Sequence, residues 1–205
     1  MKNEIYPLFP SPLMICAQFY EFSAAEERFL EGLDMLANTG NSMSKDDRVL
    51  DAPAMAQLRE FVEAQLSLFS KKLLHIRDDN EVYITQSWVN RSTAGQYHPK
   101  HRHPNSVISG VLFLDNNEDR SLPPIRFHRA QQPFPLEFVY DELNEFNASC
   151  QTFDPDKGML VLFPSSVEHD VDRNESGRTR SSLSFNTFVR GVVGGRNQLT
   201  RVEIS

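Results

Sequence analysis

Three of the chain's six histidines fall within six positions, in the run Gly95-Gln-Tyr-His-Pro-Lys-His-Arg-His-Pro104. This run directly precedes an apolar, strand-like stretch over residues 107–114. Because side chains two apart on a strand point to the same face, His101 and His103 can present their imidazoles to one metal ion. A third histidine, His169, lies in another strand-like segment far downstream. The spacing predicts a three-histidine metal site on a β-scaffold.

The available ligand types restrict the metal. The two cysteines, Cys16 and Cys150, are few and far apart and carry no motif, so cysteine ligands are absent and a structural zinc site held by thiolates is disfavoured. Imidazole ligands with an open coordination position suit iron, copper, nickel or catalytic zinc. A solvated basic loop is the other interpretation of the histidine run. Its position at the mouth of an apolar strand favours the metal site.

A row of polar side chains follows the third histidine. The turn signal Asn174-Glu-Ser-Gly177 separates two strand-like runs, residues 167–171 and 180–189. They are predicted to form a hairpin in which His169 lies opposite Ser182. Directly opposed residues share a face of the sheet. A slip of the strand register by one residue would move His169 to the opposite face from Arg180. The face with the histidine would then carry the following polar residues: Arg180, Ser182, Ser184 and Asn186.

An inward-facing row of this kind needs a binding partner, since an unpaired polar group costs several kcal/mol to bury. A dicarboxylate co-substrate would provide one. The planar guanidinium of Arg180 can hold a carboxylate through two charge-assisted hydrogen bonds, and Ser182 can add a third. The alternative is an ion pair of Arg180 with Asp170 or Asp172 at the barrel rim.

The remaining sequence indicates the scaffold. Two amphipathic helices are expected, the first over residues 23–36 with Ser23-Ala-Ala-Glu26 as a capping box. The second runs from Asp51-Ala-Pro-Ala54 to about Leu74. About eight short apolar or alternating runs follow and predict strands. These runs are residues 82–89, 106–114, 125–128, 136–140, 150–153, 158–163, 167–171 and 180–189.

Eight strands after two helices favour a mainly β fold, a β-sandwich or jelly-roll with helices supporting one sheet. We expect a single domain over residues 1–205, with helical support over about 23–75 and a β-core over about 81–190. The proline-rich residues 1–22 are expected to be extended or an edge strand. Residues 141–148 fit a short helix or lid, and the tail after Gly191 fits a final edge strand.

Composition excludes several classes of protein. With 205 residues the chain can bury a substantial core. Its net charge of −7 disfavours nucleic acid as a partner. Neither a run of roughly 18 apolar residues nor a secretory signal is present, and the few cysteines fit a reducing compartment, so a cytoplasmic protein without a membrane span is expected. A homodimer is compatible with the proline-rich N-terminus or the apolar tail, and nothing requires it.

The motifs together resemble a known family, the 2-oxoglutarate-Fe(II) oxygenases of bacteria and marine phages, distant relatives of prolyl 4-hydroxylases. The resemblance covers about residues 82–189. It rests on the motifs Trp88-Val-Asn90, Gly95-x-Tyr-His-x-x-His101-x-His103-Pro-Asn-Ser106, Ser109-Gly-Val111, Phe163-Pro-Ser-x-x-x-His169 and Arg180-x-Ser-x-Ser-Phe-Asn186.

This resemblance implies a double-stranded β-helix core that binds Fe(II) and 2-oxoglutarate. It places His101 and His169 on the iron, and Arg180, supported by Ser182, on the distal carboxylate of 2-oxoglutarate. His103 stands where the family has a carboxylate ligand, a departure from the two-histidine-one-carboxylate triad. His98 is a substitute ligand if the strand register differs.

Further residues are expected around this site. Asn105 and Asn186 are candidates to orient the ligands through hydrogen bonds. Gln86, Trp88 and Asn90 alternate on one strand face and could line the pocket, although Trp88 fits a core position equally well.

The implied reaction uses O2 to hydroxylate either a protein side chain, as prolyl hydroxylases do, or a small metabolite. A three-histidine dioxygenase that does not use 2-oxoglutarate is an alternative, in which Arg180 is structural. A non-catalytic jelly-roll binding or assembly module with a structural metal is another.

Overall fold

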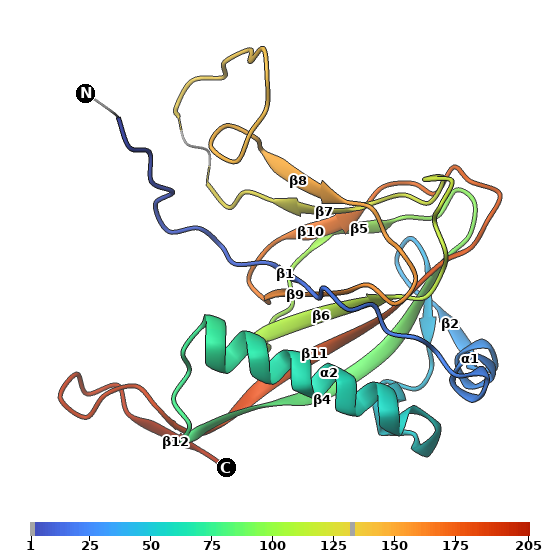
Figure 1. The fold of residues 1–205 in the computed structure, drawn as a ribbon, viewed down its shortest axis with the longest axis horizontal. Coiled ribbons are helices and arrows are strands. Elements are labelled where there is room, and N and C mark those ends of the chain that lie inside the picture. Colours follow the sequence, from blue (N-terminus) through green and yellow to red (C-terminus); the bar gives the residue numbers. More distant parts are fainter. Residues whose placement is uncertain (1–2, 132–133) are drawn as a thin grey trace.

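The computed structural model describes residues 3–131 and 134–205. Two antiparallel β-sheets face one another, and the helices cover the outer face of the larger sheet (Figure 1). The larger sheet has the strand order β1-β9-β6-β11-β4-β3-β2, with β12 paired to β11. The smaller sheet has the order β5-β10-β7-β8. The chain therefore folds as a jelly-roll, as its strand pattern predicts, with the double-stranded β-helix core that the family resemblance implies.

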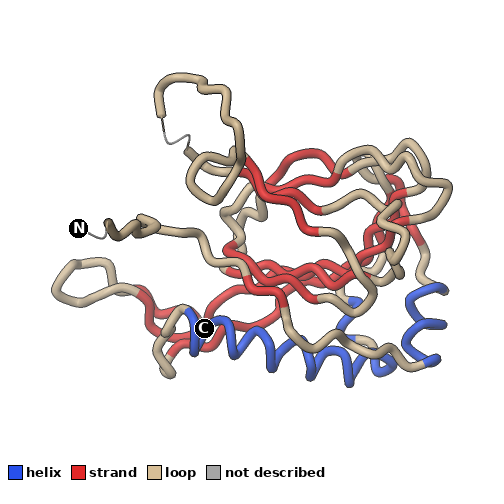
Figure 2. The backbone as a smooth tube through the Cα atoms, turned by 45° about the horizontal axis from the view of Figure 1, so that its top comes forward, coloured by secondary structure: helices blue, strands red, loops and turns tan. Residues whose placement is uncertain are grey.

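The larger sheet is built around two long strands, β4 (Asn80–Ser92) and β11 (Arg180–Val193). Its other strands are β1 (Met14–Ile15), β2 (Met35–Ala37), β3 (Ser42–Ser44), β6 (Ile108–Phe113), β9 (Leu160–Pro164) and β12 (Val202–Ile204). The smaller sheet consists of β5 (His98–His101), β7 (Ile125–His128), β8 (Cys150–Phe153) and β10 (His169–Val171). Figure 2 shows the two sheets as separate layers of strands joined by loops at either end.

Helix α1 (Ala24–Glu31) begins with the expected capping box. The Ser23 hydroxyl accepts from the Glu26 N–H at 3.3 Å, and the Glu26 carboxylate accepts from the Ser23 N–H at 2.8 Å. The helix ends at Gly32, earlier than the predicted residue 36, because the following residues pair with β3 as strand β2.

Helix α2 (Ala56–Ser67) follows two 3₁₀ turns, η1 (Val49–Asp51) and η2 (Pro53–Met55), and continues as a π-helical turn, η3 (Leu68–Leu73). Its buried face, Leu58, Val62 and Leu66, belongs to one core cluster with Leu183 and Phe185 of β11. A second cluster fills part of the space between the sheets, and it includes Val111, Phe127, Phe163 and Val171. Side-chain alternation along β11 thus leaves Ser182 and Ser184 on the face between the sheets.

Several strand predictions are confirmed. Strands β7 and β8 have the predicted bounds, and the tail returns as β12 on β11. Residues 136–140, predicted as a strand, belong to a loop, and the short helix considered for 141–148 is a series of turns. In the N-terminal segment, of which residues 1 and 2 lie outside the described residues, the described part forms one short strand, β1, and the N–H groups of Cys16 and Tyr20 also donate to the Leu160 and Gly158 carbonyls. Strand β5, which carries His101, has no apolar pattern and was not predicted as a strand.

The predicted hairpin is wrong, because β10 and β11 lie in opposite sheets. Strand β10 pairs with β5 and β7, whereas β11 pairs with β4, β6 and β12. The turn residue Asn174 does not close a hairpin. Its side-chain amide donates to the carbonyls of Ser92 and Arg178 at 2.8 Å, and its backbone pairs with Gly95 and Gln96. These bonds hold the crossing between the sheets.

Among the described residues, no helix is long and apolar enough to cross a membrane.

Candidate metal centre

The three predicted ligands meet between the sheets. His101 ends β5, and His169 begins β10 directly opposite it. His103 follows His101 by two residues, and its backbone N–H donates to the Ser165 carbonyl at 3.0 Å. One ring nitrogen from each of the three imidazoles lies within 4.8 Å of the others. The structure thus brings the three side chains to a single point.

Hydrogen bonds at the opposite ring nitrogens fix the tautomers. The Nδ1 of His101 lies 2.8 Å from the Pro99 carbonyl, and the Nδ1 of His169 lies 3.1 Å from the Val167 carbonyl. A carbonyl oxygen can only accept, so each Nδ1 carries the proton and each Nε2 presents a lone pair.

His103 is held by a side chain instead of a backbone carbonyl. Its Nδ1 lies 2.5 Å from Oδ1 of Asn186, which also accepts from the Ser109 hydroxyl at 3.1 Å. Ser109 in turn lies 2.8 Å from Ser165, which donates to Ser106 at 2.7 Å. The hydrogen bond from Ser109 keeps the amide oxygen of Asn186 facing the imidazole, so the Nε2 of His103 also presents a lone pair.

The distance between the ligand atoms fits a metal ion. The Nε2 atoms of His103 and His169 are 3.2 Å apart, and in these tautomers neither can donate to the other. A metal–nitrogen bond of about 2.1 Å gives a nitrogen–nitrogen separation of about 3.0 Å at a right angle and about 3.4 Å at the tetrahedral angle. The observed separation lies between these values. A cation between the two lone pairs would remove their repulsion.

The protonation state also fits a metal site. Burial, reinforced by the neighbouring His101, lowers the pKa of His169 to about 3. Burial likewise lowers the pKa of His103 to about 4, although the Asn186 hydrogen bond opposes the shift. His98, stacked on His101 with ring centres 4.4 Å apart, has its pKa lowered to about 3, again mainly by burial. Neutral imidazoles are the form that binds a metal.

Arg180 faces the same space from the larger sheet. Its side chain is buried, with its guanidinium 5.3 Å from the centre of the Phe113 ring. Its Nε donates to the Pro123 carbonyl at 3.0 Å, and its Nη2 is buried without a hydrogen-bond partner in the described structure. Burial lowers the pKa of Arg180 to about 10, which leaves the group cationic at neutral pH.

The ion pair considered for Arg180 is not formed with either predicted acid. The Asp170 carboxylate accepts from Arg126 at 2.7 and 3.0 Å and lies 3.0 Å from the His128 Nε2. Asp172 also pairs with Arg126. The Asp115 carboxylate, which accepts the backbone N–H of Ser181, acts on Arg180 through its charge and opposes the lowering of the Arg180 pKa.

A single cavity brings these groups together. It is lined by Trp88, Asn90, His98, His101, His103, Val111, Ile125, His169, Asp170, Val171, Arg180, Ser182 and Ser184. Trp88 stacks on His103 with ring centres 5.8 Å apart, and the Asn90 amide donates to Ser184 at 3.2 Å. Sequence reasoning did not assign Val111, Ile125 or Val171 to the pocket, because apolar side chains at strand positions fit the core equally well.

Two predicted residues lie elsewhere. Gln86 is exposed and donates to Asp47 at 3.0 Å, so it does not line the cavity. Asn105 is exposed in the turn after His103, with a φ of 57° in the left-handed region that asparagine tolerates. Of the two asparagines expected near the ligands, only Asn186 contacts one.

Facing antiparallel sheets with an imidazole cluster and a buried arginine between them define a metal-site protein of the double-stranded β-helix class. Residues 86–186 match the family described as "Putative 2OG-Fe(II) oxygenase", and this part of the chain belongs to that family. A comparison with curated proteins finds no match.

Solved structures of the same fold include an oxidoreductase of the 2OG-Fe(II) oxygenase family from Burkholderia pseudomallei. It is 14% identical, has a TM-score of 0.60, and the alignment covers 85% of this chain and 83% of that one. A prolyl-4-hydroxylase from Pseudomonas putida is 18% identical, with a TM-score of 0.53 and coverage of 86% and 92%. HygX from Streptomyces hygroscopicus, crystallised with nickel, 2-oxoglutarate and hygromycin B, is 11% identical, with a TM-score of 0.56 and coverage of 86% and 82%. At these identities the likeness shows the fold.

Proposed function

We propose that this protein is an Fe(II)- and 2-oxoglutarate-dependent oxygenase. In this proposal His101, His103 and His169 hold the iron, and Arg180 with Ser182 binds the distal carboxylate of 2-oxoglutarate. The family match supports the proposal. So do the crystal structures of HygX, of the same fold, with nickel and 2-oxoglutarate and with iron.

The observation that carries the proposal is the unpartnered guanidinium nitrogen of Arg180. Burying a cationic donor without a hydrogen bond is costly, because water no longer solvates it. A carboxylate from the co-substrate would satisfy this nitrogen and would approach along the cavity that also contains the imidazoles. The Ser182 hydroxyl lines the same cavity and could donate to the second oxygen.

Bound iron and 2-oxoglutarate would supply the oxidative chemistry, which couples decarboxylation of the oxo acid to hydroxylation of a substrate by O2. The chain's own residues position these reactants. Three tautomerically fixed imidazoles point at one place, Arg180 orients the co-substrate, and the apolar walls Val111 and Ile125 limit the access of water.

The substrate is proposed to be a protein side chain, as for prolyl hydroxylases, or a small metabolite. Among proteins of the same fold, the Pseudomonas putida enzyme is a prolyl-4-hydroxylase, and a prolyl hydroxylase from Trichoplax adhaerens was solved in complex with a peptide fragment.

A three-histidine dioxygenase that does not use 2-oxoglutarate is a second candidate. The observation in its favour is His103, since the nearby carboxylate of Asp170 is held by Arg126 and His128 and is not free to complete the usual triad. In this case 2-oxoglutarate would not alter metal binding. A non-catalytic module with a structural metal would instead show metal-dependent melting without turnover.

An anaerobic titration with Fe(II), with and without 2-oxoglutarate, tests the proposal. The chelated complex should give a weak visible charge-transfer band in the wild type. Arg180→Ala and His169→Ala should both lose the band. Arg178→Ala is a matched control, because Arg178 is exposed and pairs with Asp119 on the surface.

A band that is absent from the wild type, although iron binds, would overturn the co-substrate assignment. Under air, oxygenase activity predicts succinate formation from 2-oxoglutarate, even without the natural substrate, at a slow uncoupled rate. A protein that binds both ligands but forms no succinate would be a binding module instead.

A further inference from the structure

Exposed apolar side chains are concentrated in two short segments. Among the described residues, nineteen large hydrophobic side chains are exposed, and ten of them lie within residues 5–9 or 134–146. We call residues 5–9 the arm and residues 134–146 the lobe. The ten residues are Ile5, Tyr6, Leu8, Phe9, Phe134, Leu136, Phe138, Val139, Leu143 and Phe146. An exposed apolar concentration of this kind marks an interaction surface.

The lobe leaves the smaller sheet at the metal end. Phe127 of β7 pairs with His169, and the N–H of the next residue, His128, donates to the Glu168 carbonyl at 2.8 Å. Arg129 then closes the neck of the loop, since its N–H donates to the Ser149 carbonyl at 2.9 Å. The loop that carries the lobe therefore begins directly after the strand that lies opposite a proposed ligand.

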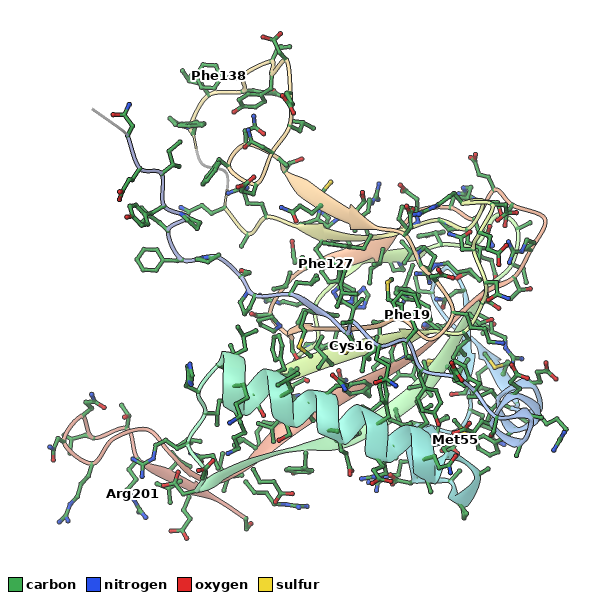
Figure 3. The ribbon with its side chains drawn as sticks, viewed as in Figure 1. Cys16, Phe19, Met55, Phe127, Phe138 and Arg201 are labelled. Carbon is green, nitrogen blue, oxygen red and sulfur yellow. The ribbon has the colours of Figure 1, made fainter. Side chains whose placement is uncertain are left out.

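The arm approaches the same end from the larger sheet. Met14 of β1 pairs antiparallel with Leu162 of β9, so the chain before Met14 runs toward Phe163. The Phe163 ring lies 4.8 Å from the His169 ring, and Leu13 packs against the cluster that contains Phe163. Figures 1 and 2 both show the N-terminal segment and the β7–β8 loop on the same side of the molecule. In Figure 3 the ring of Phe138 lies far out on that loop.

The charge of these segments indicates which partner they suit. Residues 134–149 contain four acidic residues, Glu137, Asp141, Glu142 and Glu145, and no lysine, arginine or histidine. These carboxylates would repel an anionic lipid surface, which attracts segments rich in lysine and arginine instead. A second copy docked through a two-fold axis would place two copies of the same acidic patch in one interface, where their like charges would repel.

We propose that the arm and the lobe bind an extended polypeptide segment rich in apolar and basic residues, and that this polypeptide is the substrate delivered to the three-histidine site. The substrate part of this inference rests on the proposed oxygenase function. The aromatic rings supply apolar contact area: Phe134 packs edge-on against Phe138 at 5.8 Å, and both remain about half exposed. The carboxylates would pair with lysine or arginine side chains of the polypeptide.

Binding can be tested with three labelled synthetic peptides of equal length. One alternates lysine with phenylalanine, leucine and proline. The second has glutamate in place of lysine, and the third has serine in place of the apolar residues. Fluorescence anisotropy with the full-length protein should show binding of the first peptide alone, weakened by added salt because part of the attraction is between charges.

The double variant Phe9→Ser/Val139→Ser should weaken this binding at least tenfold. Both side chains are almost fully exposed, 95% and 102%, so their loss leaves the core intact. The matched control is Leu199→Ser/Val202→Ser, which removes two exposed apolar side chains from the C-terminal tail and should leave binding unchanged. Asp141→Asn/Glu142→Gln should weaken binding at low salt and have little effect at high salt.

We call Phe9→Ser/Val139→Ser the arm-lobe variant. Equal binding of all three peptides would overturn the proposal, and so would equal peptide affinity of the arm-lobe variant and the Leu199→Ser/Val202→Ser control. Concentration-dependent dimerisation that the arm-lobe variant abolishes would assign the surface to a second copy. Binding to neutral lipid vesicles that the variant abolishes would assign it to a membrane. The lysine-containing peptide should also stimulate succinate formation in the wild type more than in the arm-lobe variant.

The two proposals can fail separately. Absence of the iron and 2-oxoglutarate band with intact peptide binding would reject the oxygenase function and keep the docking surface. A normal band, combined with no peptide binding and no stimulation of succinate formation, would reject the docking surface alone.

Discussion

Each of the three histidines depends on the acceptor behind it. His101 and His169 donate to backbone carbonyls, which no substitution of a side chain removes directly. His103, by contrast, depends on the side chain of Asn186. The third position of the metal site is therefore the one that a single side-chain change can disturb without touching a ligand.

Asn186→Leu should weaken metal binding by about 10- to 100-fold, the usual effect of removing a hydrogen-bond partner of a metal ligand. Without the acceptor, the His103 ring can rotate or adopt the other tautomer. Asn186→Asp keeps an acceptor and should keep most of the affinity. The measurement is a competition titration of Co(II) against a chromophoric chelator. Asn105→Ala, at the exposed asparagine, is the control, and equal affinities for the leucine variant and this control would contradict the role of Asn186.

The buried imidazoles should also make the metal-free protein sensitive to acid. Their pKa values of about 3 for His169 and about 4 for His103 lie below the unfolded value of about 6.5. The unfolded chain therefore binds more protons between these values, and stability falls as the pH falls through that window. Each histidine contributes a slope of at most about 1.4 kcal/mol per pH unit.

Thermal melts of the metal-free protein should show a melting temperature that drops between pH 7 and pH 5. In His169→Gln, which removes one titrating group, the drop should be smaller. An identical pH dependence in wild type and variant would show that other groups cause it.

At the scale of elements, sequence periodicity located most strands but not their partners. Strands β7 and β8 were predicted to the residue, because each is a short apolar run between turns. Strand β5 was missed because His98-Pro-Lys-His101 has no apolar alternation, and it becomes a strand by pairing with β10. Residues 136–140 have the apolar character of a strand but lie in the exposed lobe, where the sheets offer no place to pair.

The sequence placed Arg180 and His169 on one face because it predicted a hairpin, and that hairpin does not form. Arg180 and His169 do line one cavity, but they face each other from opposite sheets instead of sitting side by side in a hairpin. Local turn signals cannot distinguish a hairpin from a crossing between sheets. The side-chain amide of Asn174 donates to the carbonyls of Ser92 and Arg178 and so fixes the segment that crosses between the sheets. Ser92 is distant from Asn174 in sequence, so local patterns do not reveal this contact.

Gly110 in the Ser109-Gly-Val111 motif shows how closely β6 and β11 pack. A Cβ at this position would lie 2.1 Å from the Phe185 ring and 2.8 Å from Leu162, and both side chains are fully buried. Gly110→Ala should therefore destabilise the fold by about 1–3 kcal/mol, the usual cost of overpacking. Urea unfolding measures the change.

Gly177→Ala is the matched control for this substitution. No atom lies within 4 Å of a Cβ built there, so its free energy of unfolding should change little. If Gly110→Ala were as stable as Gly177→Ala, the close contact with Phe185 would not be present in solution.

At the scale of the whole molecule, the proposed site joins the two sheets. His101 and His169 belong to the smaller sheet, whereas Arg180 belongs to the larger one. The metal would crosslink β5 with β10, and 2-oxoglutarate would bridge from the metal to β11. Both ligands would need the two layers in place in order to bind, so both should stabilise the folded chain.

The two ligands should raise the melting temperature in separable steps. A ligand at about 100 times its Kd adds about 2.7 kcal/mol, which for a chain of this size corresponds to about 5–10 °C. Nickel, which binds without reacting with O2, should give a first rise, and 2-oxoglutarate should give a second that requires the metal. His169→Ala should lose both steps because the co-substrate needs the metal as an anchor, whereas Arg180→Ala should keep the first and lose the second. A second step that survives in Arg180→Ala would show that the co-substrate does not use this arginine, and the buried guanidinium would then serve the packing of β11 against Phe113 and Pro123.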